Sequence, residues 1–252
     1  MSLQLDTWEP DFPKPDPIKK SGFLRIAISG PSDSGKSHLF EYFAHKYFSR
    51  LYEVFIVFCS SDDQRAKYAK ILNTKHCYKS YDSSIIDTVM QAQDKKEKSG
   101  GIPFRIMIIY DDFANRSTRT DNSIFDQFIS DRHSAISICM ILHDIMLLDR
   151  VSRNMLTHIF MTRQLQTQVY ENMAEQYLMG PFKSTSNEEI PDHLKNQSKG
   201  NIVRLLTNAM NDHTKNYNIV CILVQHYMRD QNAGLFDVLK TFKAPASWTV
   251  KK

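Results

Sequence analysis

The stretch that most constrains this chain is the octapeptide at residues 30–37, which directly follows the apolar run 24–29. It fits the pattern G-x-x-x-x-G-K-[ST], and its members are Gly30, Pro31, Ser32, Asp33, Ser34, Gly35, Lys36 and Ser37. Glycines let the backbone turn tightly enough for its N–H groups to surround phosphates, and a following helix points its N-terminus at them. We predict a phosphate-binding (Walker A) loop in which Lys36 reaches the β- and γ-phosphates and the Ser37 hydroxyl binds Mg²⁺. An ordinary glycine turn is the alternative.

Composition limits the classes of protein to which the chain can belong. With 252 residues, 42% of them hydrophobic and 24% charged, the chain can bury a substantial core as one large α/β domain or two small ones. A formal net charge of +4 is compatible with an anionic partner but does not establish one.

The cysteines and the N-terminus indicate the compartment. The chain has four cysteines, Cys59, Cys77, Cys139 and Cys221, which lie far apart and form no C-x-x-C pair. Such a distribution is typical of buried free thiols in a reducing compartment. Charged residues interrupt any signal-like apolar region near the start, and no apolar stretch reaches about 18 residues. We therefore expect an intracellular protein without a membrane span.

Apolar runs of strand length alternate along the chain with stretches of helical periodicity. The predicted strands cover residues 24–29, 54–59, 105–110, 135–142, 157–161 and 218–224. The predicted helices cover residues 37–48, 63–73, 83–98, 121–132, 165–178 and 201–212. This alternation predicts a doubly wound, mostly parallel sheet flanked by helices, the α/β fold of a P-loop NTPase. Because no linker separates a second unit, we expect one domain over residues 22–252, including a C-terminal extension.

The first 21 residues form a separate segment. Pro10, Pro13, Pro15 and Pro17 exclude a helix there and favour an extended arm. The arm could pack on the domain through Trp8 and Phe12, or it could be solvated and disordered.

Two acids directly follow the strand 105–110 and supply the second half of a nucleotide site (Walker B). A carboxylate at the end of a buried strand can hold Mg²⁺ beside the γ-phosphate, and we assign this to Asp111. Asp112 can instead polarise the attacking water. Two solvated acids at a strand end would be the ordinary interpretation without the phosphate loop upstream.

A further strand, 135–142, ends in His143 and Asp144. This arrangement resembles the additional-strand, catalytic-acid class of P-loop ATPases. In that class a polar residue at the end of the strand beside the phosphate-loop strand senses the γ-phosphate. His143 is our first candidate and Asp144 the second, while a capping or surface histidine is the alternative.

Four segments together carry a more specific resemblance. Residues 30–37, 108–112, 137–143 and 153–158 resemble the DNA-packaging ATPases of large double-stranded DNA viruses, of the poxvirus, giant-virus and virophage type within the FtsK/HerA superfamily. The Arg-Asn-x-x-Thr-His element and the spacing carry the family signal, and the similarity covers roughly residues 22–225. The family commonly has glutamine at the sensor position and Asp-Glu as the acidic pair.

The resemblance implies an ATP-hydrolysing motor that uses Mg²⁺ and translocates double-stranded DNA, without reading its sequence, into a viral capsid. It implies a homo-oligomeric ring, usually a hexamer, with capsid proteins as partners. The implied location is the host cytoplasm or a viral factory, or the virion itself.

A ring further implies an arginine supplied in trans to the neighbouring subunit's nucleotide. Arg153 is the first candidate, followed by Arg132 and Arg163, and each could equally be an ordinary surface or carboxylate-paired arginine. Candidate DNA contacts are residues 115–120, the polar stretch 183–200, and the C-terminal Lys240, Lys243, Lys251 and Lys252.

Three other functions use the same loop. A nucleotide or small-molecule kinase needs an acceptor pocket and an arginine-bearing lid, and neither is evident in the sequence. A GTPase needs an Asn-Lys-x-Asp motif, which the chain lacks. A nucleotide-gated scaffold that hydrolyses little is disfavoured because the loop and the acidic pair are both intact.

Overall fold

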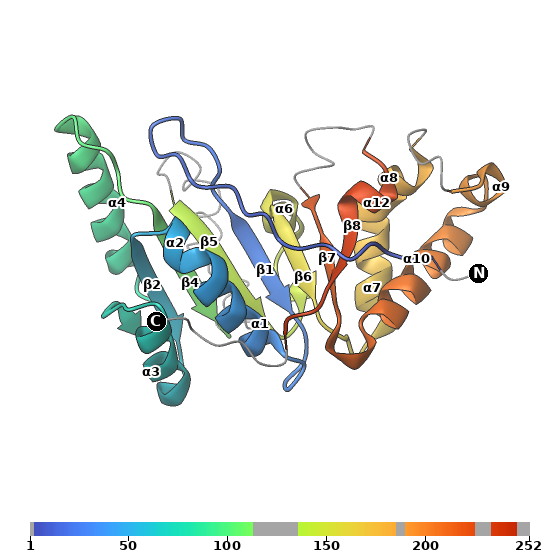
Figure 1. Cartoon of the computed structure of the whole chain (residues 1–252), viewed down its shortest axis with the longest axis horizontal. Helices are drawn as coiled ribbons and strands as arrows, with labels where there is room; N and C mark the ends of the chain where they lie inside the picture. The colour runs from blue at the N-terminus through green and yellow to red at the C-terminus, as the bar shows by residue number, and fades with distance from the viewer. Residues whose placement is uncertain (1–2, 113–135, 185–189, 225–232, 246–252) are drawn as a thin grey trace.

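The computed structural model describes residues 3–112, 136–184, 190–224 and 233–245. Within these residues one eight-stranded sheet runs in the order β3-β2-β4-β5-β1-β6-β7-β8 (Figure 1). Its strands are β1 (Arg25–Ser29), β2 (Val54–Cys59), β3 (Cys77–Tyr78), β4 (Ile106–Asp111), β5 (Ile136–Leu142), β6 (His158–Met161), β7 (Ile219–Ile222) and β8 (Leu239–Phe242). Strands β1 to β6 pair in parallel, whereas β7 and β8 are antiparallel to their neighbours.

Helices cover both faces of the sheet and bury two apolar clusters. One face carries α1 (Lys36–Phe43), the π-helical turn η1 (Ala44–Phe48), α2 (Ser49–Leu51) and α3 (Asp62–Ile71). The other face carries α4 (Ser83–Lys98), α7 (Thr167–Met173), η4 (Ala174–Leu178), α8 (Met179–Lys183), α9 (Asp192–Lys195), α10 (Lys199–His213) and α12 (Leu235–Val238). Three short helices lie in connections: η3 (Ile145–Leu147), α6 (Arg150–Met155) and η5 (Lys215–Tyr217). Side chains alternate across β1, with Ile26 and Ile28 in one cluster and Ala27 in the other, as a strand covered on both faces requires.

The predicted α/β fold with a mostly parallel sheet is confirmed. All six predicted strands are present, and β5 lies between β4 and β1, as the additional-strand class requires. Two short strands escaped prediction: β3 has only two residues, and β8 interrupts its apolar pattern with Lys240 and Thr241. The predicted helix 121–132 lies outside the described residues.

The N-terminal arm packs on the domain. Figure 1 shows it crossing the near side of the sheet before it enters β1. Thr7 forms a parallel bridge with Thr241, and the Trp8 amide donates to the Thr241 carbonyl at 2.8 Å. This contact covers the outer edge of β8, whose backbone groups would otherwise lack partners.

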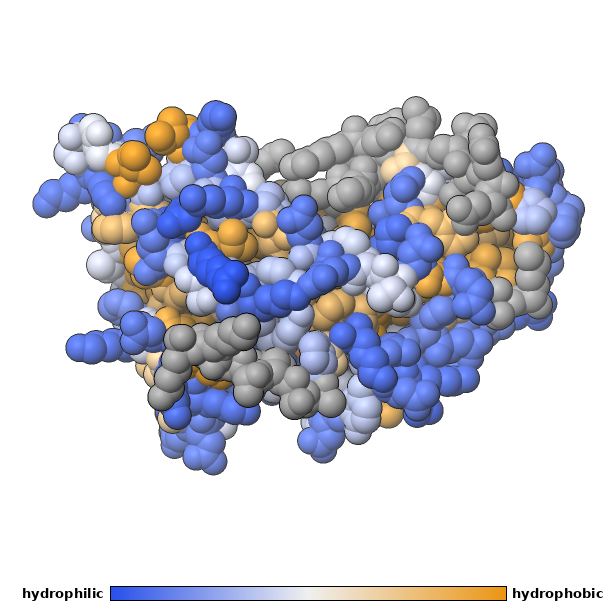
Figure 2. Space-filling view, in the orientation of Figure 1, coloured by the Kyte–Doolittle hydropathy of each residue, from blue (hydrophilic) through white to orange (hydrophobic). Residues whose placement is uncertain are grey.

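Aromatic packing holds the arm against the same face as α1. The Trp8 ring stacks on Phe160, and Phe12 is buried edge-on against Phe43 with ring centroids 5.3 Å apart. Figure 2 shows mainly hydrophilic residues over this face, so the arm closes the apolar cluster beneath it. No helix in the described part of the chain is long and apolar enough to cross a membrane.

We expect Phe12→Ala to lower the free energy of unfolding by about 3–5 kcal/mol, because the change leaves a cavity in an aromatic cluster. Ile18, on the same arm but 70% exposed, is the matched control, and Ile18→Ala should change stability by less than about 0.5 kcal/mol. Urea unfolding followed by circular dichroism measures both. Equal effects of the two substitutions would mean that the arm does not contribute to the folded core.

Candidate nucleotide site

The predicted phosphate loop connects the end of β1 to the start of α1. Gly35 caps α1 with a left-handed φ of 93°, a conformation that side chains with a Cβ rarely adopt. The Lys36 ammonium donates to the Pro31 carbonyl at 2.7 Å, so its side chain folds back over the loop. Burial lowers the pKa of Lys36, and the nearby Asp112 and Asp111 carboxylates oppose this effect. The loop thus presents a partly desolvated cation where phosphate oxygens are expected.

Strand β6 holds the other side of the loop and contributes residues that the sequence analysis did not identify. The Thr162 hydroxyl donates to Ser34 Oγ at 2.7 Å. The side-chain amide of Gln164 donates to the Ser29 carbonyl at 3.1 Å. A Cβ at Gly30 would lie 1.7 Å from Thr162 Oγ1, so this position requires glycine. Thr162 directly follows the apolar run 157–161 and Gln164 lies two residues further on, so their place after a predicted strand was the signal in the sequence.

The acidic pair occupies the end of β4, and its two carboxylates have different environments. Asp111 is buried, and its Oδ2 accepts from the Tyr68 hydroxyl at 2.9 Å and from the Cys59 thiol at 3.5 Å. Burial raises the pKa of the Asp111 carboxyl, and the hydrogen bond from Tyr68 opposes this shift. Burial also raises the pKa of Cys59 to about 12, which keeps the thiol protonated as a donor.

Asp112 leaves the strand through a left-handed turn with φ 58°, and its side chain is 42% exposed. The turn is held by a hydrogen bond from its amide to the Ile141 carbonyl at 3.1 Å. Asp112 is therefore accessible to solvent, whereas Asp111 is fixed in the interior.

The added strand β5 brings His143 to this pair. Its Nε2 lies 3.2 Å from Asp112 Oδ1, and both side chains are about half exposed. The second candidate, Asp144, instead accepts from the Met146 amide at 2.8 Å and caps η3. A cavity of about 450 Å³ connects His143 and Asp144 with Pro31 and Ser32 of the loop. Of the two sensor candidates, His143 contacts the acidic pair.

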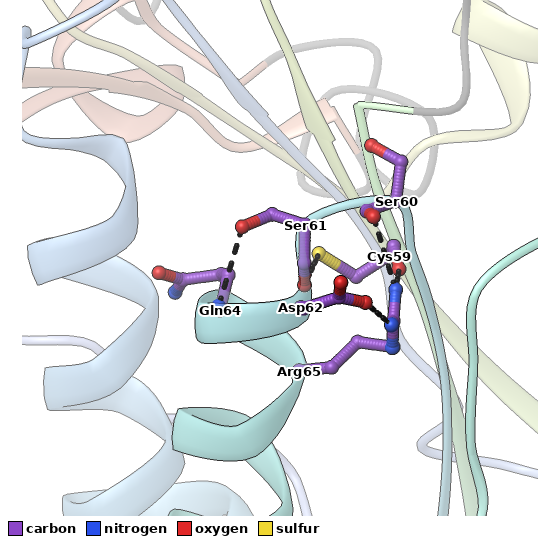
Figure 3. A network of polar contacts seen from close by, with 6 residues as sticks. All are labelled: Cys59, Ser60, Ser61, Asp62, Gln64 and Arg65. Atoms are coloured by element: carbon purple, nitrogen blue, oxygen red, sulfur yellow. Dashed lines mark hydrogen bonds and ion pairs between the residues drawn. The ribbon is translucent and has the colours of Figure 1, made fainter.

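Figure 3 shows how the end of β2 is tied to α3, the helix that carries Tyr68. Arg65 Nη1 donates to the carbonyls of Cys59 at 2.6 Å and Ser60 at 3.0 Å. Arg65 also pairs with Asp62, and Ser61 caps the helix by accepting from the Gln64 amide at 3.3 Å. These bonds fix the position from which the Tyr68 hydroxyl reaches Asp111.

Ser37 and Asp111 offer a hydroxyl and a carboxylate, the hard oxygen donors that suit Mg²⁺. Among the described residues no three His, Cys, Asp or Glu side chains gather into a metal cluster. Such a donor set fits an ion that keeps most of its ligands as water and substrate phosphate.

Arg153, the first candidate for the trans arginine, makes hydrogen bonds within its own chain. The residue is buried in α6, where Nη1 donates to the Leu148 carbonyl at 2.5 Å and Nε to Gln176 Oε1 at 3.1 Å. Nε and Nη1 of the guanidinium are therefore engaged inside its own chain. Arg163, in contrast, is exposed directly after β6, between Thr162 and Gln164. Arg132 lies outside the described residues.

The candidate DNA contacts are only partly described. Residues 115–120, 185–189, Lys251 and Lys252 lie outside the described part. Lys240 pairs with Asp6 at 3.2 Å, and Lys243 lines a cavity beside the phosphate loop.

All four cysteines are free, and Cys59, Cys139 and Cys221 are buried, as predicted.

Comparison with known proteins decides the family. The model of the family described as "Poxvirus A32 protein" matches residues 14–185, which is more than half of the chain. The chain belongs to the poxvirus A32 protein family. Membership makes it a viral genome-packaging ATPase, confirming the predicted resemblance, and the kinase alternative is not favoured. No curated protein matches the chain.

Solved structures of two viral packaging ATPases share the fold of this A32 family member at low identity. The DNA-packaging ATPase B204 of Sulfolobus turreted icosahedral virus has a TM-score of 0.53 and 16% identity, over 88% of this chain and 98% of that chain. The packaging NTPase B204 of Sulfolobus turreted icosahedral virus 2, in complex with AMPPCP, has a TM-score of 0.50 and 13% identity, over 88% and 98%. EssC (ATPases 2 and 3) from Geobacillus thermodenitrificans has a TM-score of 0.47 and 11% identity, and the match spans 60% of this chain but 34% of that longer chain.

We expect Tyr68→Phe to weaken the binding of Mg²⁺ and to raise the Mg²⁺ concentration for half-maximal ATPase rate by about tenfold, because Asp111, the expected metal ligand, loses the hydrogen bond that orients it. Tyr52→Phe is the matched control, since it removes another buried hydroxyl, 2.9 Å from Ser137 Oγ near the start of β5 and far from the site. Titration of Mg²⁺ at saturating ATP measures the effect. The same Mg²⁺ requirement in both variants would contradict a role for Tyr68 in orienting Asp111.

Proposed function

We propose that this chain binds MgATP at the phosphate loop and hydrolyses it to drive double-stranded DNA into a viral capsid. The observation that carries the proposal is the insertion of β5 between β1 and β4, which sets His143 against Asp112 at the edge where the loop lies. A kinase would instead transfer the phosphoryl group to an acceptor molecule. Stimulation of ATP hydrolysis by DNA distinguishes the motor from the kinase.

The roles of the loop residues follow from their positions. The loop amides and Lys36 hold the β- and γ-phosphates, and release from the Pro31 carbonyl frees the ammonium to bind them. Mg²⁺, held by the Ser37 hydroxyl and Asp111, would neutralise charge on the phosphates. Tyr68 and Cys59 keep the Asp111 oxygens oriented.

Asp112 is the base that orients the attacking water, because it is the accessible carboxylate of the pair. His143 holds Asp112 at 3.2 Å and lines the same cavity as the loop residues Pro31 and Ser32. A γ-phosphate in that cavity competes with Asp112 for the imidazole. We infer that a bound γ-phosphate draws His143 away from Asp112. The Asp112 carboxylate is then free to orient the attacking water.

A ring of identical subunits, a hexamer in our proposal, surrounds the DNA and completes each site with an arginine from the neighbour. We assign this role to Arg163 ahead of Arg153, because Arg163 is exposed and lies between Thr162 and Gln164, which contact the phosphate loop and β1. DNA is held through its phosphates, so binding is independent of sequence and weakens with salt. Capsid proteins are the further partners, and the host cytoplasm or a viral factory is the proposed location.

We expect double-stranded DNA of several unrelated sequences to raise the ATPase rate of the wild-type protein to similar levels. Asp112→Asn should retain ATP binding and lose at least about 10²-fold in rate, since it removes the base, whereas Lys36→Ala should lose binding itself. Phosphate release and equilibrium binding of ATP measure the two effects. A rate that is indifferent to DNA but depends on a nucleoside or small metabolite as phosphoryl acceptor would overturn the motor in favour of a kinase.

The trans arginine is tested by mixing inactive subunits. Arg163→Ala subunits keep their own loop, and Lys36→Ala subunits keep their arginine, so mixed rings should recover part of the ATPase activity that neither variant has alone. Arg153→Ala mixed in the same way should give no recovery, because its bonds lie within its own chain. Recovery with Arg153→Ala and none with Arg163→Ala would reverse the assignment.

A further inference from the structure

A second cavity opens beside the phosphate loop, and the steps of hydrolysis do not use its outer wall. It has a volume of about 650 Å³, which is in the range of small-molecule sites. The loop and the start of α1 form one wall. The other wall comes from the end of η5, the start of β7 and the residues after β8: Asn216, Tyr217, Ile219, Lys243 and Ala244.

Tyr217 is unusual in both conformation and exposure. Asn216 and Tyr217 are consecutive left-handed residues with φ 56° and 60°, and this conformation is rare for a bulky side chain. The Tyr217 ring remains 72% exposed, so burial of the ring does not offset the backbone strain. Strain of this kind persists where the surrounding structure enforces it, often at ligand sites.

The Tyr217 ring lies over the phosphate loop. Its Cδ1 is 3.7 Å from the position of a Cβ built on Gly35, the glycine that caps α1. Ile219, which is buried, adds an apolar surface to the same wall. His38, at the start of α1, holds the residues after β8 near the loop, since its Nε2 lies 2.8 Å from the Pro245 carbonyl.

We propose that Tyr217 is the platform on which the nucleobase of the bound triphosphate stacks. The assignment rests on the proposed nucleotide function and adds the base to it: phosphates on the loop amides, and the flat base in the adjoining cavity against the Tyr217 ring. A planar aromatic ligand gains from an exposed ring and an apolar wall, whereas a bare phosphate chain does not.

The test compares ATP with inorganic tripolyphosphate, each with Mg²⁺, by isothermal titration calorimetry on the full chain. Tyr217→Ala should weaken ATP binding about tenfold, the usual loss for one stacked base, and leave tripolyphosphate binding unchanged. Tyr217→Phe should bind both ligands as the wild type does, because the ring is kept. Phe104→Ala, which truncates another partly exposed aromatic residue, is the matched control and should affect neither ligand.

Unchanged tripolyphosphate binding also shows that the Tyr217→Ala variant is folded. Equal weakening of both ligands would make Tyr217 a support for the loop and overturn the proposal, as would no loss of ATP binding. Lys36→Ala tests the proposed nucleotide function separately. If this variant still binds both ATP and tripolyphosphate, the phosphate site is wrongly assigned, whichever result the Tyr217 variants give.

Discussion

The structure depends on parallel strands that end along one edge of the sheet. Because β1, β4, β5 and β6 run in the same direction, their carboxyl ends deliver the phosphate loop, the acidic pair, His143 and Thr162 to neighbouring places. The register aligns Asp111 of β4 with Ile141 of β5, and Ser29 of β1 with Leu142, so the polar residues that follow lie at the same level. Residues more than 100 positions apart thus form one site without a dedicated loop to gather them.

Within that edge, two adjacent acids have different environments. Asp111 ends the strand in the interior, where a tyrosine hydroxyl and a protonated thiol orient it. A left-handed turn then releases Asp112 toward solvent and His143. This separation of consecutive carboxylates by a backbone turn is what the proposed roles, one acid for Mg²⁺ and one for the attacking water, depend on.

The two halves of the nucleotide site are supported by different layers. Helix α3, tied to the end of β2 by Arg65, supplies Tyr68 to the acidic pair. The residues after β6 supply Thr162 to the phosphate loop and Gln164 to the end of β1, and η5 supplies Tyr217 to the outer side of the loop. The arm adds Trp8 and Phe12 over the aromatic cluster beneath α1, so the helix that begins at the loop is packed from both sides.

The sequence by itself determined the phosphate loop, the parallel α/β sheet and the acidic pair, because these depend on local patterns: glycine spacing, apolar runs of strand length and acids directly after a strand. Only the tertiary structure decided which residues support them. Tyr68 looked like an ordinary helical tyrosine until α3 placed it against Asp111, and Tyr217 carried no motif. Arg153 lies in a family-like element, but its guanidinium bonds to Leu148 and Gln176 within the fold. Such roles depend on burial and on partners distant in sequence, which periodicity and spacing do not encode.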